Sequence, residues 1–300
     1  MKTAEVFAPA KVNLTLHVTG RRDDGYHALD SLVAFAPVGD RLTLTEADTL
    51  TVDVAGPEAA GVPGGEENLV WRAARVVSPS RGAAIRVEKH LPAAAGLGGG
   101  SADAAAAIRA LLQLWGETAL LEELAGADLT PFARSLAGLG ADVPMCLLPR
   151  PLRARGIGQR TEAVPLAPLP AVLANPRVEV PTGAVFRALT HADNAPMPDD
   201  LPDLTGTQAA LDFIAAGRND LQAPAQAVAP VVGEVLDALA GLPGARVVRM
   251  SGSGATCFAL FGTEAEAEAA MHALAARRPK WWIAGGTLGD QLSASMAVLS

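Results

Sequence analysis

Alternating apolar and polar residues dominate the first third of the chain, a pattern typical of half-buried β-strands. These alternating or β-rich runs lie at residues 5–18, 31–38, 41–46, 50–54 and 84–90. Because they follow one another closely, they predict an antiparallel sheet in the N-terminal part. Apolar residues at helical spacing predict helices at residues 67–77, 101–115, 119–125 and 130–139.

The second half of the chain mixes shorter strand and helix patterns. Strands are predicted at residues 152–154, 161–164, 171–175, 245–250, 255–261 and 281–288, and helices at 183–190, 221–240 and 264–276. The Pro-rich stretch 164–170 predicts a domain boundary, and the Pro- and Asp-rich stretch 193–205 predicts a mobile loop. Since strands and helices come in clusters rather than in strict alternation, the pattern indicates an α+β fold.

Length and composition indicate a globular protein. Half of the 300 residues are hydrophobic and 19% are charged, which suits one large domain or two smaller ones. No stretch approaches the ~18 apolar residues of a membrane helix. Glu5 and Lys11 interrupt any signal-peptide core, so we expect a cytoplasmic protein without a membrane partner. Cys146 and Cys257 lie in apolar runs and are expected to be buried thiols.

The charge distribution argues against a nucleic-acid partner. The chain has 24 basic and 32 acidic residues, a net charge of −8, and no run of Lys and Arg that would follow a phosphate backbone. Any phosphate that this acidic chain handles must therefore meet a few local cations. The lysines are Lys2, Lys11, Lys89 and Lys280.

A glycine-rich loop at residues 91–101 is the strongest chemical signal. Four glycines between residues 96 and 100 precede a run of good helix formers, with Ser101 near the expected helix cap. Unpaired N–H groups and the positive end of the helix dipole suit a phosphate there. A Walker loop would need a lysine before Ser101, where Gly100 stands, and neither a dinucleotide fingerprint nor a nucleophile elbow fits the spacing. A plain connecting loop remains the alternative.

Four further segments carry weaker signals. Lys11 and Asn13 share one face of a predicted strand, which fits either an anion site or a solvated strand face. Tyr26, the one tyrosine, and His27 follow a turn and could stack on a nucleobase or simply pack the turn. Asp142 begins an apolar stretch as either a helix cap or a general base. The loop 251–255 is a tight hairpin, a contact to substrate or a support for the first glycine loop.

Read in order along residues 8–261, these segments resemble the GHMP kinases. They read Pro-Ala-Lys-x-Asn-Leu, Gly-Arg-Arg-x-Asp-Gly-Tyr-His, Leu-Pro-x-x-Ala-Gly-Leu-Gly-Gly-Gly-Ser, Gly-Ala-Asp-Val-Pro and Ser-Gly-Ser-Gly-Ala. The first two segments are similar to the branch that phosphorylates 4-(cytidine 5'-diphospho)-2-C-methyl-D-erythritol in the non-mevalonate isoprenoid pathway. Residues 67–69, 180–186 and 219–221 look like further motifs of that branch.

The resemblance implies a fold and a reaction. The fold would be α+β, with an N-terminal ribosomal-protein-S5-like β/α domain (residues 1–165) that binds ATP and a C-terminal α/β sandwich domain (residues 166–300). The reaction would move the γ-phosphoryl group of ATP to the tertiary 2-hydroxyl of the cytidyl substrate, with Mg²⁺ expected and a monomer or weak homodimer as the assembly.

The resemblance also implies roles for individual residues. Asp142 would be the general base, with Lys11 beside it as a catalytic cation and Asn13 binding substrate oxygens. Tyr26 and Phe186 would sandwich the cytosine, His27 would read its polar edge, and Thr182 would lie in the same substrate site. ATP would contact Asn68 near the adenosine and, along the glycine loop, Pro92, Ala94, Gly96, Leu97, Gly98, Gly99, Gly100 and Ser101.

One departure from the family and two rival functions remain. The family usually continues Ser-Asn after Ser101, but here Ala102 and Asp103 follow. An aspartate in the first helical turn would repel a triphosphate, so Asp103 is expected to point away from ATP or to hold the metal. Another GHMP kinase, of the homoserine or mevalonate type, and a non-catalytic ligand sensor are the alternatives.

Overall fold

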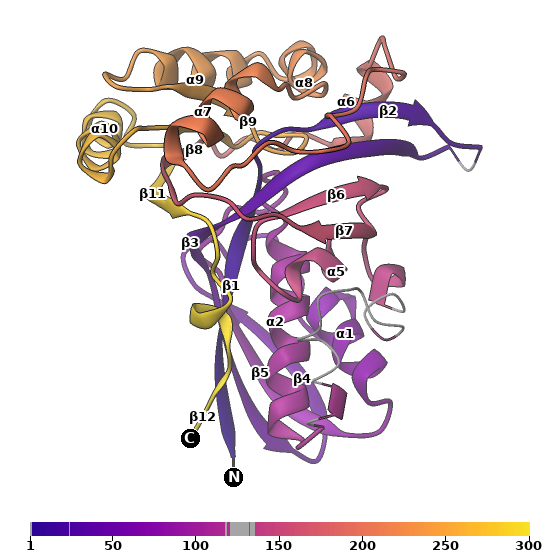
Figure 1. The fold of residues 1–300 in the computed structure, drawn as a ribbon. Helices are drawn as coiled ribbons and strands as arrows, with labels where there is room; N and C mark the ends of the chain where they lie inside the picture. The colour runs from indigo at the N-terminus through magenta and orange to yellow at the C-terminus, as the bar shows by residue number, and fades with distance from the viewer. Residues whose placement is uncertain (1, 24, 118, 121–131, 133–135) are drawn as a thin grey trace.

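The computed structural model describes residues 2–23, 25–117, 119–120, 132 and 136–300, and within them the chain forms two sheets (Figure 1). The first sheet has the order β12-β1-β3-β5-β4, with β2 and β6 pairing with the other end of β3, and β7 with β6. Its strands are β1 (Thr3–Asn13), β2 (His17–Arg21), β3 (His27–Ala47), β4 (Leu50–Ala55), β5 (Gly82–Glu88), β6 (Leu152–Gly156), β7 (Arg160–Ala163) and β12 (Val298–Leu299).

Two predictions for this sheet need correction. The separate strands expected at 31–38 and 41–46 are one long strand, β3. It runs on through Gly39 because a residue without a side chain fits where the β1 backbone lies very close. A Cβ at Gly39 would lie 2.1 Å from the Ala8 carbonyl oxygen, and the register of β1 shifts there, between Pro9 and Lys11. The sheet is also not wholly antiparallel, since β4 and β5 pair in parallel. The crossover helix α1 (Leu69–Val77) between them permits that direction.

Helix α2 (Gly99–Leu114) packs on the first sheet and is buried along nearly its whole length. A stretch of small residues, Ala104–Ala107, lets it lie in the same apolar core as the side chains of β1, β3 and β5. The short helix α5 (Val143–Cys146) packs beside it. The helices predicted at 119–125 and 130–139 fall largely outside the described residues; a 3₁₀ turn at Leu136–Gly138 is described at the end of the second.

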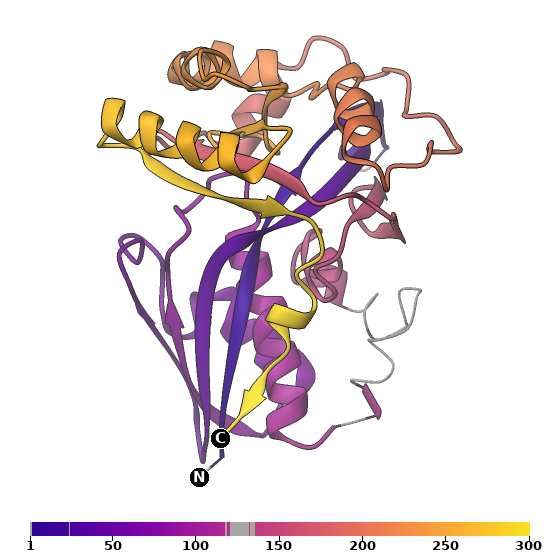
Figure 2. The same ribbon diagram turned by 60° about the vertical axis from the view of Figure 1, so that its left-hand side comes forward.

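The second sheet has the order β11-β8-β10-β9, from β8 (Leu169–Asn175), β9 (Val247–Met250), β10 (Cys257–Leu260) and β11 (Trp282–Leu288). One face of this second sheet packs on β1 and β3, and together they form one apolar core. Helices pack around this sheet, at the end of the molecule opposite the termini (Figures 1 and 2). They are α6 (Thr182–Ala188), α7 (Thr207–Ala216), α8 (Gln222–Val228), α9 (Val231–Ala240) and α10 (Glu264–Arg277).

Two helices of this part differ from the prediction. The single helix expected at 221–240 is interrupted, because α8 ends at Val228 and Pro230 stands before α9. A proline there cannot donate the N–H that a continuous helix needs. Helix α7 was not predicted, although Ala210, Leu211 and Ile214 form its buried face.

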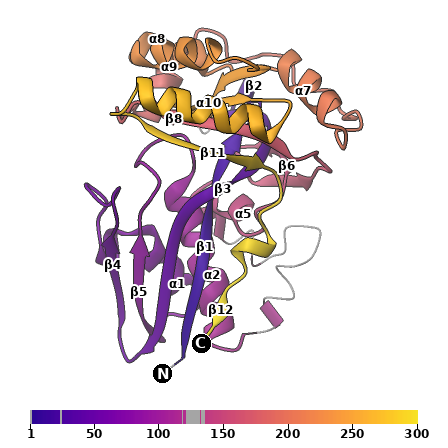
Figure 3. The same cartoon turned by 90° about the vertical axis from the view of Figure 1, so that its left-hand side faces the viewer.

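The change from one sheet to the other falls between β7 and β8, close to the predicted boundary at residues 164–170. The last residues then return to the first sheet, where β12 pairs with β1 beside the N-terminus (Figure 3). In the described part of the chain, no helix is long and apolar enough to cross a membrane.

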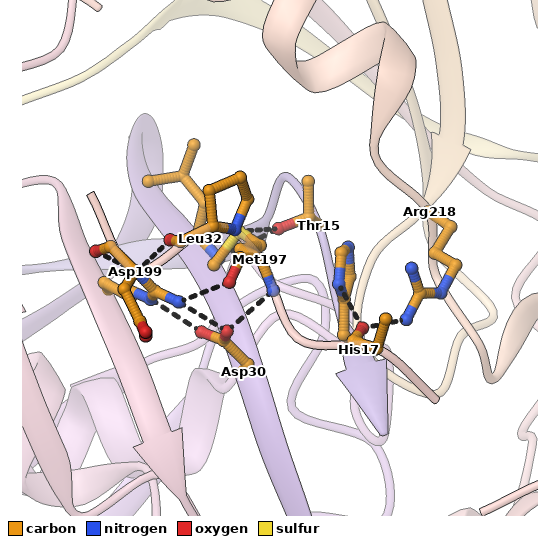
Figure 4. Close-up of polar contacts among 10 residues, drawn as sticks. Thr15, His17, Asp30, Leu32, Met197, Asp199 and Arg218 are labelled. Carbon is orange, nitrogen blue, oxygen red and sulfur yellow. Dashed lines mark hydrogen bonds and ion pairs between the residues drawn. The ribbon is translucent and has the colours of Figure 1, made fainter. Parts of the chain in front are cut away.

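The stretch 193–205, expected to be mobile, is fixed to the first sheet by charged side chains (Figure 4). Asp30 on β3 accepts two hydrogen bonds from Arg153 on β6, at 2.8 and 2.6 Å, and one from the Met197 N–H at 2.9 Å. Arg153 also donates to the carbonyl oxygens of Met197, Pro198 and Asp199. A second anchor is Ala195, whose carbonyl oxygen accepts from His17 and Arg218.

Replacing Asp30 by alanine is expected to destabilise the fold strongly. Asp30 and Arg153 are only 3% and 2% exposed, so the variant leaves a buried guanidinium without its carboxylate. Such a loss costs about 3–5 kcal/mol in the free energy of unfolding. Urea unfolding measures it, with D200N as the control because Asp200 is an exposed carboxylate of the same stretch. A loss no larger for D30A than for D200N would contradict this account of the anchor.

Candidate active site

A cleft of about 1180 Å³ collects nearly all of the residues singled out in the sequence. Those that line it are Lys11, Asn13, Tyr26, His27, Asn68, Pro92, Ala94, Gly96, Gly98, Gly99, Gly100, Ser101, Asp142, Thr182 and Phe186. Leu97 is different: its side chain is buried in the apolar core, and its carbonyl oxygen accepts a hydrogen bond from the Lys11 N–H at 2.9 Å.

Lys11 joins the two polar groups expected to act on the substrate. Its ammonium group donates to Asn13 Oδ1 at 2.8 Å and lies 3.2 Å from Asp142 Oδ2. The alternation of β1 puts Lys11 and Asn13 on one face, as predicted. The Lys11 side chain is 6% exposed and that of Asp142 is 35% exposed. The carboxylate therefore has one side held by a cation and the other open to the cleft.

Asp142 stands at the N-cap position of α5, but its side chain caps nothing. The position is thus that of a cap, but the carboxylate is directed to Lys11 and does not cap the helix; the role of general base stays a prediction. Residues 143–146 behind it are buried. A rigid, apolar support of this kind fixes where the carboxylate points.

Asn13 is held in place from two directions. Its side-chain N–H donates to Ser31 Oγ at 2.8 Å, and its backbone N–H donates to Ser251 Oγ at 3.0 Å. Because Asn13 Oδ1 accepts from Lys11, these bonds also fix the orientation of the amide. Ser31 was not singled out in the sequence, and its position in an ordinary strand pattern gave no signal for it.

The glycine loop ends in a left-handed residue that begins helix α2. Gly98 is the N-cap, with φ of +64°, and a Cβ there would lie 3.1 Å from Lys11 Cε. Ser101 is thus the third residue of the helix rather than its cap. The backbone N–H groups of Gly99, Gly100 and Ser101 belong to the first turn, which has no intrahelical acceptors for them. This end of α2 is suited to bind an anion.

The second glycine loop supports the first, one of the readings left open by the sequence. Ser251 Oγ donates to the Gly96 carbonyl oxygen at 2.9 Å, and the Thr256 N–H donates to that of Ala95 at 3.1 Å. A Cβ on Gly96 would lie 2.4 Å from the Ser251 carbonyl oxygen, so the two loops fit only with glycine there. The same loop also connects the paired strands β9 and β10.

Asp103 does not lie in the first turn of α2, because the helix begins at Gly99, two residues earlier than predicted. Its Oδ2 accepts a hydrogen bond from Lys89 Nζ at 2.6 Å, and Lys89 also pairs with Asp40 on β3. Asp40 and Lys89 were not predicted as site residues. The one signal for Lys89 was its place as a rare lysine immediately before the glycine loop.

Aromatic rings gather around the residues expected to bind the pyrimidine. His27 stacks on Phe186 with the ring centroids 4.9 Å apart and the planes 22° apart, whereas Tyr26 is 64% exposed. Burial, and next to it the charge of Arg21, lowers the pKa of His27 below its ordinary value. Its ring is therefore neutral at pH 7 and can both donate and accept. Thr182 Oγ1 lies 2.8 Å from Ser253 Oγ, in the second glycine loop.

Asn68 has a structural task in addition to lining the cleft. Its Oδ1 accepts from the Val70 N–H at 2.9 Å as the N-cap of α1, and its Nδ2 donates to the Pro63 carbonyl oxygen at 2.7 Å. The amide is thereby engaged on both sides. Asn68 therefore serves a ligand indirectly, because it fixes the surface of the cleft between α1 and residues 61–63.

The side chains of the site do not form a dedicated metal cage. Within the described residues, no group of three or more His, Cys, Asp or Glu is placed to hold a metal ion. Asp142 pairs with Lys11, and Asp103 with Lys89. A lysine ammonium beside each carboxylate competes with a cation for the same oxygens. The residues therefore do not fit a protein-only magnesium site.

Comparison with known proteins agrees with this architecture. The family model "GHMP kinases N terminal domain" matches residues 68–150, and "GHMP kinases C terminal" matches residues 202–280. Among solved structures, a homoserine kinase from Cytophaga hutchinsonii shares the fold, with a TM-score of 0.68 at 20% identity over 99% of this chain and 97% of that one.

Relatives of higher sequence identity indicate one branch of the GHMP kinases. A 4-diphosphocytidyl-2-C-methyl-D-erythritol kinase from Cereibacter sphaeroides is 53% identical over 93% of this chain and 97% of its own length. One from Paramagnetospirillum magneticum is 49% identical over 96% of this chain and 99% of its own. A crystal structure of 4-(cytidine 5'-diphospho)-2C-methyl-D-erythritol kinase matches with a TM-score of 0.72 at 39% identity, over 95% of this chain and 99% of that one. The chain thus belongs to the 4-diphosphocytidyl-2-C-methyl-D-erythritol kinase family of the GHMP kinases.

Proposed function

We propose that the chain transfers the γ-phosphoryl group of ATP to the 2-hydroxyl of 4-(cytidine 5'-diphospho)-2-C-methyl-D-erythritol. The observation that supports this best is the contact between Lys11 and Asp142 inside a cleft that also holds a glycine loop and an aromatic cluster. Phosphoryl transfer needs mainly positioning and charge stabilisation. A cation, a base and a phosphate loop around one cleft supply both.

Asp142 is the general base in this proposal. Its exposed oxygen accepts the proton of the substrate hydroxyl as the oxygen attacks the γ-phosphorus. Lys11, 3.2 Å away, pairs with the carboxylate before the attack and stabilises the negative charge that develops during it. Asn13, oriented by Ser31 and Lys11, binds a substrate oxygen in the same place.

The glycine loop binds ATP through its backbone. The N–H groups at the start of α2 take the phosphates, with the hydroxyl of Ser101 beside them, and residues 92–98 form the wall of the phosphate site. Asn68 fixes the surface against which the adenosine lies. Any Mg²⁺ that accompanies ATP would be held mainly by phosphate oxygens and water, as is usual for this ion.

The pyrimidine binds at the aromatic cluster. Tyr26 and Phe186 stack on its two faces, while the neutral His27 reads its polar edge and Thr182 lies beside it. His27 covers one face of Phe186 in this structure, so a base that stacks on that face must displace the His27 ring. We further propose that the chain works in the cytoplasm as a monomer or weak homodimer, with residues 1–165 and 166–300 as its two domains.

A coupled assay of ADP release with a panel of alcohols tests the proposed function. The cytidyl methylerythritol substrate is expected to stimulate ADP release, and homoserine and mevalonate are not. Stimulation by homoserine or mevalonate alone would favour another GHMP kinase. Nucleotide binding without any turnover would favour a ligand sensor.

Replacing Tyr26 by alanine is expected to raise the KM for the cytidyl substrate by about tenfold or more, because stacking of a base on an aromatic ring contributes ~1–3 kcal/mol. Steady-state kinetics with each substrate varied in turn measures the effect. Y26F keeps the ring and should raise the same KM far less. If the change were confined to the KM for ATP, the two nucleotide sites would be wrongly assigned.

A further inference from the structure

Two carboxylates share one ammonium group beneath the glycine loop. Asp40, Lys89 and Asp103 are 0%, 4% and 4% exposed, and Lys89 Nζ donates to both aspartates. With every group ionised, this cluster would carry a net negative charge almost completely shielded from water. An uncompensated buried charge of this kind is costly.

The two aspartates differ in how well their oxygens are satisfied. Asp40 Oδ1 accepts from the backbone N–H groups of His90 and Leu91, at 2.6 and 2.9 Å, while its Oδ2 accepts from Lys89. Asp103 Oδ2 also accepts from Lys89, but Asp103 Oδ1 is buried without any hydrogen-bond partner. The proton that neutralises the cluster therefore belongs on Asp103.

Asp103 lies where a phosphate is expected. It is one turn along α2 from Gly99 and Gly100, and helical side chains point back toward the N-terminus of their helix. Neither glycine has a side chain to cover it, and a Cβ on Gly99 would already lie 3.6 Å from Lys89 Nζ. Both Lys89 and Asp103 line the cleft. The Asp103 side chain, which carries the unsatisfied oxygen, is thus at the edge of the proposed ATP site.

We propose that Asp103 binds ATP as a neutral carboxylic acid, whose Oδ1 hydroxyl donates a hydrogen bond to a phosphate oxygen. The inference rests on the proposed function, because it takes the glycine loop as the ATP site. Binding then requires a proton on Asp103, taken up from solvent whenever the carboxylate was ionised beforehand. The acidic residue beside a triphosphate becomes a donor instead of a repelling charge.

The electrostatic surroundings agree with this role. Burial, helped by the charge of Asp40 and opposed by Lys89, raises the pKa of Asp103 to about 8. Among the described residues, Cys146 on α5 also interacts electrostatically with Asp103; burial raises the pKa of Cys146 to about 12, so that it stays an uncharged thiol. The sign follows from the raised pKa: the neutral form prevails below about pH 8, and ATP binding weakens as the pH rises above it.

Calorimetric titration of the whole protein with ATP and Mg²⁺, without acceptor, tests the proposal. Performed at several pH values in two buffers of different ionisation enthalpy, it gives the number of protons taken up per ATP. The wild type is expected to take up more protons as the pH rises through about 8, with a Kd that increases up to about tenfold per pH unit. D103N, whose amide is a permanent donor, should show neither effect, and protons exchanged by ATP itself cancel in the comparison.

Two further variants make the result decisive. D53N removes an exposed carboxylate on β4, outside the cleft, and should behave like the wild type. D103A removes the donor and should weaken ATP binding by about tenfold below pH 8, with folding checked by circular dichroism. Equal proton uptake by the wild type and D103N, or a folded D103A with unchanged affinity, would overturn the proposal for Asp103. Failure of the wild type to bind ATP at all would instead overturn the proposed function.

Discussion

Replacing Asp142 by asparagine is expected to lower kcat by about two to four orders of magnitude, the usual contribution of a positioned general base. The amide keeps the shape of the side chain but cannot accept the hydroxyl proton. Because Asp142 caps no helix, the fold should be little affected. Steady-state and single-turnover kinetics measure the loss, with the KM values for ATP and for the cytidyl substrate changing far less than kcat.

D200N is a suitable control for D142N, since it makes the same change at an exposed aspartate outside the cleft. It should turn over like the wild type. Near-normal kcat in D142N would mean that the proton leaves by another route, and the assignment of Asp142 as the base would have to be abandoned.

Replacing Lys11 by methionine is expected to have the second largest effect, a loss of about 10²–10³ in kcat. Methionine keeps most of the buried stem but removes the charge that faces both Asp142 and the reacting phosphoryl group. It also frees Asn13 Oδ1, which accepts from Lys11 at 2.8 Å. The loss should therefore appear in kcat first and in the KM for the cytidyl substrate second.

Lys280 offers the matched control for Lys11, because it is an exposed lysine far along the chain from the site and does not line the cleft. K280M should be indistinguishable from the wild type in turnover. A K11M variant that retained most of its kcat would contradict the proposal that this ammonium group stabilises the transition state.

The sequence predicted those parts of the site that depend on local pattern. Lys11 and Asn13 are two residues apart on a strand, so their shared face followed from the period of two. The glycine loop and the helix after it were evident from composition, although the start of α2 was placed two residues late because Gly99 and Gly100 are poor helix formers.

The parts that were missed depend on contacts between distant residues. The cluster of Asp40, Lys89 and Asp103 joins three positions that share no sequence pattern, so Asp103 was judged by its distance from the loop alone. The Asp30–Arg153 pair, which fixes residues 193–205, could not be predicted from the sequence for the same reason. Composition indicated a mobile loop there, because the charged side chains that hold it come from other elements.

The aromatic cluster shows a third kind of difference. Tyr26, His27 and Phe186 were expected at one pyrimidine site, and all three line the cleft. The stacking of His27 on Phe186 could not be predicted, since it brings α6 against the first residue of β3, far away in the sequence. If the proposed pyrimidine stacks on the face of Phe186 that His27 covers, the His27 ring must move first.

The most direct test of the proposed reaction is ³¹P NMR of a mixture of the protein, ATP, Mg²⁺ and the cytidyl methylerythritol substrate. We expect ADP together with a new phosphomonoester signal. That signal should be a singlet, because the carbon at the tertiary 2-hydroxyl carries no hydrogen to split it. Absence of ADP, or a phosphomonoester split by protons of a primary or secondary carbon, would contradict the proposed function.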